Sequence, residues 1–433
     1  MNQTLDFIRF FRSSSPYIHS HRGKSFVIAF GGEVTLSTHF SDFIHDIALL
    51  SSLGVKLILV HGMRPQINHQ IKLRGLTCQY HKNSRITTPD ILTCAIQACG
   101  ALRLQIESIF SMGLPNSPMH GASINVTSGN WITAKPKGIV EGVDFQHSGQ
   151  IRKLDLAAIS LSINTGSIAL LSPIGYSPTG EIFNLNYDEV AREVAIQMKA
   201  DKLIFFTKEK GMTDLDGHLV RELSPDKIHE IALSEDNKTL VTHAFSSCEM
   251  GVHNCHLLSY EEEGALLTEL YTREGSGTLI SLMPYEGILQ AEIGDVGGLL
   301  ELIQPLEKEG VLVKRSRERL EQEIEHFCVI ERGGMVVGCA ALYPFPSDNM
   351  GELACLVVHP DYREMNRGQK MLRFIELKAK ELMLSRIFVL TTHTAHWFIE
   401  NDFIKGQTDE LPKEKKQLYN YQRSSQVFFK QIS

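Results

Sequence analysis

The chain is predicted to be an α/β protein of more than one domain, and three observations lead to this prediction. Its 433 residues exceed the usual length of a single domain. Strand-like and helix-like segments alternate through its first part, a pattern typical of a mainly parallel sheet with crossover helices. Near the C-terminus, residues 353–377 read as a strand, a glycine-containing turn and a helix.

Composition narrows the class of protein. The net charge of −7 argues against a nucleic-acid-binding protein. The longest apolar runs, such as Val55 to Val60, are far too short to span a bilayer, and no signal-peptide cleavage site follows the N-terminus. The 8 cysteines include no C-x-x-C pair and read as reduced thiols. We therefore expect a cytoplasmic protein with no nucleic-acid or membrane partner.

A short histidine- and cysteine-containing segment resembles a metal site at first sight. Cys248, His253, Cys255 and His256 lie close together in the sequence. Their spacing matches no zinc-binding pattern. No metal is therefore expected.

The first part of the chain begins with an aromatic segment, residues 5–11, predicted to be a short helix that ends within Ser13 to Pro16. Such an exposed apolar helix needs a partner, either its own domain or a second subunit. Two buried strands follow, Ser25 to Phe30 and Val55 to Val60. Further strands are expected at 131–135, 168–171 and 202–206, with helices at 43–53, 67–74, 91–110 and 262–271.

Glycines follow both of the first two strands. Gly31-Gly32 comes directly after the first strand, and His61-Gly62 ends the second. In open α/β sheets ligands lie beyond the carboxyl ends of the strands, and glycines there allow the backbone to approach an anion. Glycines that merely form turns would give the same spacing.

The stretch 352–380 carries the most informative chemistry. Leu353 to Val358 is an apolar, partly β-branched run that His359-Pro360 ends. Asn366, Arg367 and Gly368 then lead into a helix. This order directs a helix N-terminus and backbone N–H groups toward one spot, which suits a pyrophosphate. A surface turn of an α/β domain would look alike.

This stretch resembles the acyl-CoA site of the GNAT-type N-acetyltransferases, where a strand ending in V-x-P precedes a Q/R-x-x-G-x-G/A loop. Gly368 fits the first glycine, whereas Met365 and Lys370 depart from the pattern. The resemblance implies a mixed α/β domain and acetyl-CoA as co-substrate. The residues it places at acetyl-CoA are Cys355, Leu356, Val357, Val358, Asn366, Arg367, Gly368, Gln369 and Lys370.

The following segment extends the resemblance. Residues 387–392 (IFVLTT) read as the next strand, and 395–403 (AHWFIENDF) is similar to the family's W-F-x-x-x-G-F segment, with Asp402 replacing the glycine. In this fold the two parallel strands separate. The gap leaves room for pantetheine.

The N-terminal part resembles an amino-acid-kinase domain, which is an αβα sandwich with a mainly parallel sheet. The resemblance rests on four elements in the family's order: Gly31-Gly32, His61-Gly62, the N-x-N-x-D element at 184–188 and the E-G-S-G-T segment at 274–278. Kinases of this family carry a lysine two residues before the Gly-Gly pair, where this chain has Ala29. Phosphoryl transfer depends on such a cation. We therefore predict a kinase fold that does not phosphorylate.

Taken whole, the chain resembles the family of bacterial N-acetylglutamate synthases. The segments that carry this resemblance are 16–32, 80–87, 147–155, 262–270, 300–321, 339–346, 352–363 and 411–425. It is weakest at 230–250, where the chain is expected to be short. The resemblance implies acetyl transfer from acetyl-CoA to L-glutamate, giving N-acetyl-L-glutamate in the first step of arginine biosynthesis. It also implies feedback inhibition by L-arginine and a ring-like homo-oligomer, commonly a hexamer.

The expected domains are a regulatory amino-acid-kinase-like domain at 1–283, a linker at 284–288 and an acetyltransferase domain at 289–433. L-Arginine needs a partner for its carboxylate and an acceptor for its guanidinium. By resemblance, the residues expected to bind it are Tyr17, Lys202, Glu269, Gly275 and Gly277.

A dicarboxylate acceptor requires cations. Residues 314–319 form a dense basic cluster, and an arginine grips a carboxylate with two parallel hydrogen bonds. A solvated helix face would also be basic. By resemblance, Arg315 and Arg423 are the choices for the glutamate carboxylates, with Arg317 an alternative to Arg315.

The amine must lose a proton before it attacks a thioester. Glu352, at the start of the predicted CoA strand, can act as general base directly or through a water that Thr391 or Thr392 holds. A surface glutamate at a strand end is the structural alternative. Attack is expected to be direct, in a ternary complex, and Cys355 is expected to pack in the core rather than carry the acetyl group. No general acid is assigned, although Tyr419 and Tyr421 lie in the C-terminal segment.

Two other functions stay open from the sequence. One is a working N-acetylglutamate kinase with an accessory acetyltransferase domain, which Ala29 argues against. The other is a non-enzymatic regulator whose two domains only bind ligands, which the irregular CoA loop permits.

Overall fold

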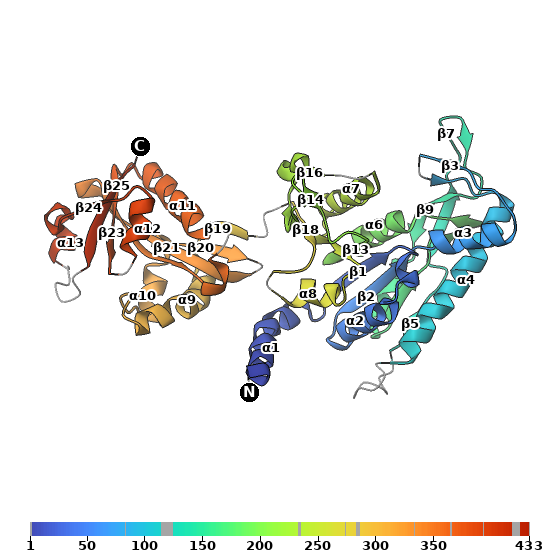
Figure 1. Ribbon diagram of the computed structural model, residues 1–433, viewed down its shortest axis with the longest axis horizontal. Helices are drawn as coiled ribbons and strands as arrows, with labels where there is room; N and C mark the ends of the chain where they lie inside the picture. Colours follow the sequence, from blue (N-terminus) through green and yellow to red (C-terminus); the bar gives the residue numbers. More distant parts are fainter. Residues whose placement is uncertain are drawn as a thin grey trace. The chain divides into compact units, whose positions relative to one another are not determined.

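The computed structural model describes residues 2–82, 84–113, 124–232, 235–272, 274–282, 286–332, 334–363, 366–392, 394–417 and 425–432. The chain separates into two compact units, Met1–Met283 and Pro284–Ser433. Each unit is built from a sheet with packed helices (Figure 1), which confirms the predicted α/β fold class.

The first unit is organised around an eight-stranded sheet with the order β15-β18-β17-β13-β1-β2-β10-β5. Its central strands pair in parallel and its β17–β18 pair is antiparallel. The strands are β1 (Ser25–Phe30), β2 (Lys56–His61), β5 (Val126–Thr127), β10 (Ile168–Leu171), β13 (Lys202–Thr207), β15 (Glu222–Leu223), β17 (Asn254–Ser259) and β18 (Thr278–Ile280).

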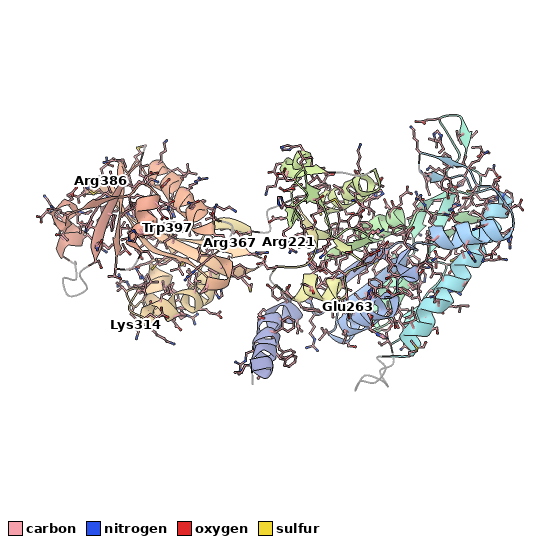
Figure 2. The ribbon with its side chains drawn as sticks, viewed as in Figure 1. Arg221, Glu263, Lys314, Arg367, Arg386 and Trp397 are labelled. Atoms are coloured by element: carbon pink, nitrogen blue, oxygen red, sulfur yellow. The ribbon has the colours of Figure 1, made fainter. Side chains whose placement is uncertain are left out.

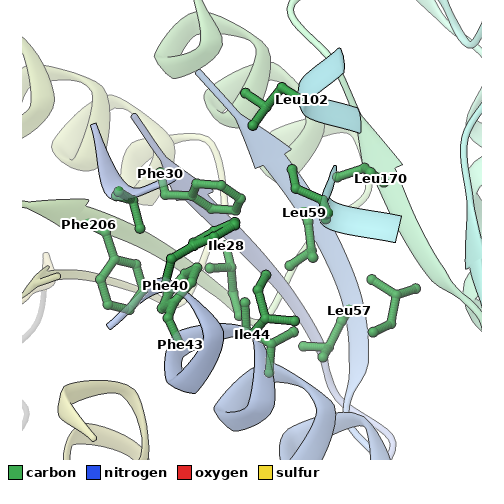
Figure 3. Packing of buried hydrophobic residues seen from close by; sticks show 14 of the residues in the cluster. Ile28, Phe30, Phe40, Phe43, Ile44, Leu57, Leu59, Leu102, Leu170 and Phe206 are labelled. Carbon is green, nitrogen blue, oxygen red and sulfur yellow. The ribbon is translucent and has the colours of Figure 1, made fainter. Parts of the chain in front are cut away.

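Both faces of this sheet are buried. Along β1, Phe26, Ile28 and Phe30 belong to one apolar cluster, whereas Val27 and Ala29 belong to the other, as the alternation of a strand requires. Figure 3 shows the first cluster, in which Ile28 and Phe30 pack with residues of the neighbouring helix. Four helices contribute buried residues to the first cluster: α2 (Phe40–Ser52), α3 (Arg64–Leu73), α4 (Pro89–Ser111) and α8 (Ala265–Tyr271). Three contribute to the second: α5 (Leu156–Asn164), α6 (Tyr187–Gln197) and α7 (Glu235–Glu249).

Smaller sheets complete the first unit. A four-stranded sheet has the order β12-β11-β6-β9, and three further pairs have two strands each. The strands are β6 (Ile132–Pro136), β9 (Gly149–Leu154), β11 (Ile174–Tyr176) and β12 (Ile182–Asn184), with the pairs β3 (Tyr80–His81) and β4 (Ser84–Arg85), β7 (Ile139–Val140) and β8 (Val143–Asp144), and β14 (Thr213–Asp214) and β16 (Ile231–Ala232).

The N-terminal helix is longer than predicted. Helix α1 runs over Asn2–His21 and contains Pro16, so the prediction that it ends at 13–16 is wrong. Proline removes one helical hydrogen bond. Beyond it, Tyr17 and Ile18 pack against the first apolar cluster, and His21 Nε2 lies 2.9 Å from the carbonyl oxygen of Leu270. These tertiary contacts outweigh the lost bond.

The second unit contains a seven-stranded sheet with the order β19-β20-β21-β22-β23-β25-β24. Residues 286–288, expected in a linker, form part of its first strand. The strands are β19 (Glu286–Gln290), β20 (Phe327–Arg332), β21 (Met335–Phe345), β22 (Met350–Val358), β23 (Arg386–Thr391), β24 (Ile404–Gly406) and β25 (Gln426–Gln431), and the helices are α9 (Val296–Lys308), α10 (Arg317–Gln322), α11 (Arg367–Glu381), α12 (Ala395–Glu400) and α13 (Lys413–Gln417).

Most of the region where the sequence resemblance is weakest forms helix α7 (Glu235–Glu249). Helix α7 packs on α6 and β17 and lies between β13 and β17 in the chain. It supplies the last crossover of the first unit's sheet.

Candidate functional site

Two neighbouring strands of the second unit separate, as predicted. Strands β22 and β23 pair in parallel only from Met350 with Arg386 to Glu352 with Phe388. Beyond Glu352 they share no register in the described part of the chain, although β22 continues its pairing with β21 as far as Val358. The facing edges of the two strands therefore offer backbone groups to a ligand, and Glu352 lies at the point where they part.

A bulge interrupts β22 just after this point. The register with β21 shifts between Cys339 and Ala341, and Cys355 opposite has a left-handed φ of 50°. The Cys355 side chain is buried, and burial raises the pKa of its thiol to about 11. The thiol is thus protonated at neutral pH, which supports a packing role over that of an acetyl carrier.

The predicted pyrophosphate loop opens α11. Asn366, with a φ of 55°, precedes the helix, and the side chains of Asn366, Gln369 and Lys370 are exposed. A Cβ added at Gly368 would lie 3.3 Å from the ring of Trp397, which α12 contributes. The start of α11 therefore carries exposed residues on its first turn, as an anion site at a helix N-terminus requires.

The side chain of Arg367 is held by other residues of the second unit. It is buried, its Nε lies 2.9 and 2.8 Å from the two carboxylate oxygens of Glu286, and its Nη1 donates to the carbonyl of Tyr362 at 3.0 Å. Figure 2 shows its place in the second unit. Since the guanidinium is committed to Glu286 on β19, only the backbone of Arg367 can contribute to a phosphate site.

Glu352 has a partner that the sequence reasoning missed. Its side chain is largely buried, it faces Tyr343 across the strand pair, and its Oε2 lies 2.6 Å from Lys415 Nζ. Lys415 lies on α13, inside a segment that carried part of the family resemblance but no predicted role. Only its lysine-rich composition could have indicated a carboxylate partner.

Arg315 is the better placed of the two alternative arginines. Its backbone N–H donates to Glu307 at 2.8 Å and its Nη1 donates to the Val313 carbonyl at 3.1 Å. Its Nε is buried without a hydrogen-bond partner among the described residues. A ligand carboxylate would supply that partner.

Arg317 instead lies on the exposed side of α10. Its Nε pairs with Glu321 one turn later, at 2.8 Å. Arg423 falls outside the described residues, as do Tyr419 and Tyr421.

Tyr343 is the cross-strand neighbour of Glu352. Its hydroxyl donates to Glu323 Oε2 at 2.6 Å, and its side chain also interacts with Arg315. Burial and the hydrogen bond to Glu323 raise the pKa of Tyr343 above its usual range. The phenol therefore stays neutral near pH 7.

The two threonines differ. Thr391 Oγ1 accepts from the Thr394 backbone N–H at 3.1 Å and lies 2.9 Å from its hydroxyl, so it stabilises the turn before α12. Thr392 Oγ1 is buried and lacks a hydrogen-bond partner in the described part of the chain. Thr392 is therefore the better candidate to hold a water.

In the first unit, four of the five predicted effector residues converge. Lys202 Nζ lies 3.3 Å from His256 Nε2, and His256 Nδ1 lies 2.7 Å from Glu269 Oε1. Glu269 Oε2 accepts from the backbone N–H groups of Ser276 and Gly277, at 2.7 and 3.0 Å. Gly275 begins this turn with a φ of 67°. The fifth residue, Tyr17, packs on the apolar cluster from α1.

Electrostatics distinguish the members of this cluster. Burial alone would raise the pKa of Glu269, but hydrogen bonds from His256 and from two backbone N–H groups lower it to about 2. Burial lowers the pKa of Lys202 to about 8. His256 lies between them, and burial and Lys202 lower its pKa. In the sequence this histidine stands out only as a possible metal ligand.

In the structure, two side chains of the histidine- and cysteine-containing segment lie on opposite faces of the sheet. Cys255 and His256 are consecutive in β17, so their side chains point to opposite faces of the sheet. Cys255 lies 3.7 Å from Cys248, whereas His256 faces Glu269.

Comparisons with known proteins cover almost the whole chain. Residues 24–259 match the amino acid kinase family and residues 298–398 the acetyltransferase (GNAT) family. An amino-acid acetyltransferase of Pseudomonas putida is 50% identical over 430 residues, which are 99% of this chain and 100% of that protein. The amino-acid acetyltransferase of Azotobacter vinelandii is 49% identical, again over 99% of this chain and 100% of that protein. The chain and these relatives thus match along nearly their full lengths.

Two solved structures of one protein are similar to this chain along almost its whole length. N-acetylglutamate synthase from Neisseria gonorrhoeae, complexed with coenzyme A and L-arginine, is 34% identical with a TM-score of 0.90, covering 98% of this chain and 99% of that one. The same protein complexed with coenzyme A and N-acetyl-glutamate gives a TM-score of 0.63 over 99% of each chain.

None of the described helices is both long enough and apolar enough to cross a membrane. The two family matches account for both units, and the curated relatives are matched along their full length. The chain belongs to the amino-acid acetyltransferase family, in which an amino-acid-kinase-like unit precedes a GNAT acetyltransferase unit.

Proposed function

We propose that this enzyme transfers the acetyl group of acetyl-CoA to the α-amine of L-glutamate, which gives N-acetyl-L-glutamate and CoA. The observation that carries the proposal is the separation of β22 and β23 at Glu352. The unpaired edge of β22 can bind the thioester, and the Glu352 carboxylate lies at the point where β22 and β23 separate, which we call the fork. The gonococcal relative, complexed with coenzyme A and N-acetyl-glutamate, supports this choice of substrates.

The residues present suit a direct transfer. Bound acetyl-CoA would lay its pantetheine along the open edge of β22 and its pyrophosphate at the N-terminus of α11. Arg315 and Arg423 would hold the carboxylates of glutamate. Glu352 would take a proton from the ammonium group, directly or through a water at Thr392, and the free amine would attack the thioester carbonyl. The CoA thiolate leaves as the amide forms. The buried, protonated thiol of Cys355 favours this ternary-complex route over an acetyl-enzyme.

The buried cluster in the first unit is our proposed site for feedback inhibition by L-arginine. Lys202 would pair with the effector's carboxylate, and Glu269 with the Gly275–Gly277 turn would accept its guanidinium. Tyr17 would close the site from α1. The gonococcal relative complexed with L-arginine supports the choice of effector.

The first unit is proposed not to phosphorylate. Ala29, at the position of the phosphoryl-binding lysine, is fully buried in the second apolar cluster. The Glu33 side chain also occupies the space beside the glycine pair, since a Cβ on Gly31 would collide with the Glu33 carboxylate. An anionic side chain beside these glycines disfavours a phosphate there.

The exposed apolar side chains of α1 support a homo-oligomer. Phe7, Phe10 and Phe11 are 64%, 53% and 57% exposed. We propose that this face packs against other subunits in a ring, as a hexamer, and that the enzyme works in the cytoplasm. Residues 1–283 would then be the regulatory domain, 284–288 the linker and 289–433 the catalytic domain.

Two assays test the substrate, the effector site and the loss of kinase activity. CoA release is measured with acetyl-CoA and L-glutamate, with and without L-arginine, and ADP release is measured with N-acetyl-L-glutamate and ATP. We expect CoA release that arginine abolishes, and no ADP. Activity with other amines alone would reject glutamate as substrate, activity indifferent to arginine would reject the effector site, and ADP release would restore the kinase alternative.

A further inference from the structure

An ion pair occupies the carboxylate that the proposed reaction uses as its base. Lys415 Nζ lies 2.6 Å from Glu352 Oε2, and the two side chains are only 23% and 10% exposed. The pair is thus largely shielded from water, where charges interact more strongly than on a solvated surface. Any ammonium group that approaches Glu352 meets the ammonium of Lys415.

The fold brings this lysine to the fork specifically. Leu411 is buried among Phe388, Val427 and Phe429, and Phe388 is in register with Glu352. Because Leu411 is anchored beside Phe388, the short helix α13 that follows it delivers Lys415 to Glu352. Its neighbour Lys413, two residues earlier, is exposed.

The charges around the fork match those of an α-amino acid. Such a substrate carries an ammonium and a carboxylate on one carbon atom, and Glu352 and Lys415 offer the opposite charges side by side. Arg315 supplies a separate cation whose Nε lacks a partner in the described residues. It reaches the same face through Tyr343, which is in register with Glu352.

We propose that Lys415 selects an α-carboxylate on the acceptor through an exchange of ion pairs. When the amino acid binds, its ammonium group takes the place of Lys415 at Glu352, and its α-carboxylate pairs with the Lys415 ammonium that is released. No covalent bond changes in this exchange, and the proton later passes from the substrate ammonium to Glu352. The arginines proposed above for the carboxylates, among which Arg315 is described, are then left for the second carboxylate, and Lys415 adds a contact to the first. The inference rests on the proposed transfer to glutamate and adds a specificity residue to it.

The test compares two acceptors that differ only at the α-carboxylate. L-Glutamate and L-isoglutamine, in which a neutral amide replaces that group, are assayed by CoA release at saturating acetyl-CoA. The variants are Lys415→Met, Lys415→Arg and, as a matched control on the same helix, Lys413→Met. For Lys415→Met we expect kcat/KM to fall by about 10- to 100-fold with L-glutamate, the effect of losing one charged hydrogen bond. The value with L-isoglutamine should be unchanged or raised.

The controls separate this role from a structural one. Lys415→Arg should recover most of the preference for L-glutamate, Lys413→Met should match the wild type, and KM for acetyl-CoA should stay constant throughout. An equal loss with both acceptors, or no loss, would overturn the exchange. If Lys415→Met melts at a lower temperature than the wild type, the test rests on Lys415→Arg. A folded Lys415→Arg variant that no longer prefers L-glutamate to L-isoglutamine would also overturn the exchange. A wild type inactive on L-glutamate would instead reject the proposed function.

Discussion

The guanidinium of Arg367 is paired with the carboxylate of Glu286, with a closest contact of 2.7 Å between Nη2 and Oε2. The pair ties the first turn of α11 to strand β19. Arg367 is 3% exposed and Glu286 is 16% exposed on their side chains, so the charges are almost fully removed from water. The side chain of Arg367, which looks like a phosphate ligand in the sequence, thus fixes the start of α11 to the sheet.

Replacing Arg367 is therefore expected to affect stability more than cofactor binding. Arg367→Met leaves the carboxylate of Glu286 buried without its partner, which costs about 3–5 kcal/mol. Urea unfolding should show this loss, while Arg373→Met, at an exposed site on the same helix, should change the free energy of unfolding little. A raised KM for acetyl-CoA with unchanged stability would return Arg367 to the binding site.

Glu352 carries the proposed base. Glu352→Gln should lower kcat by roughly 10²- to 10⁴-fold, the usual effect of losing a general base. Binding of acetyl-CoA, measured by calorimetry, should be retained because the open edge of β22 is backbone. A variant that keeps the wild-type rate at every pH would remove Glu352 from the mechanism.

The two candidate arginines give a matched pair of variants. Arg315→Gln should raise KM for L-glutamate by about 10- to 100-fold, because a charged hydrogen bond to the substrate is lost. Arg317→Gln should change it little, since Arg317 is exposed and pairs with Glu321. Steady-state kinetics at fixed acetyl-CoA distinguishes the two, and the reverse order would mean that Arg317 binds glutamate.

Inhibition by arginine should depend on pH. Burial lowers the pKa of Lys202 to about 8, below its ordinary value of 10.5. The ammonium that would bind the effector carboxylate is therefore present below pH 8 and lost as the pH rises through 8. The arginine concentration for half inhibition should increase between pH 7 and 9. In Lys202→Met inhibition should be weak at every pH in this range, and an unchanged inhibition curve in that variant would exclude Lys202 from the site.

The exposed face of α1 should govern assembly. Phe7→Glu together with Phe11→Glu places charges where the proposed ring buries aromatic rings. Light scattering should show a smaller particle than the wild type. Lys72→Glu, a charge change at an exposed site on α3, serves as the control, and an unchanged mass in the double variant would exclude α1 from the interface.

Local pattern in the sequence was enough for much of the fold. Strands β1 and β10 have the predicted bounds, Ser25–Phe30 and Ile168–Leu171, because a buried strand of a parallel sheet is a short apolar run between turn residues. The separation of the two strands of the second unit and the choice of Lys202 and Glu269 as one site were expected from the family resemblances. Neither could be derived from local pattern.

Side-chain partners from distant segments could not be read in this way. The sequence placed Arg367 at a phosphate because of its position in a loop, whereas packing turned it toward Glu286. Helix α1 continues through Pro16 because Tyr17 and Ile18 gain apolar contacts that no local rule contains.

The sequence by itself determined the two-unit α/β fold and the positions of its main strand ends, since periodicity and turn residues specify backbone conformation. The tertiary structure decided which charges meet, above all Lys415 with Glu352 and His256 with Glu269. The physical reason is that an ion pair depends on the direction and burial of both side chains, which are set only when distant elements pack together.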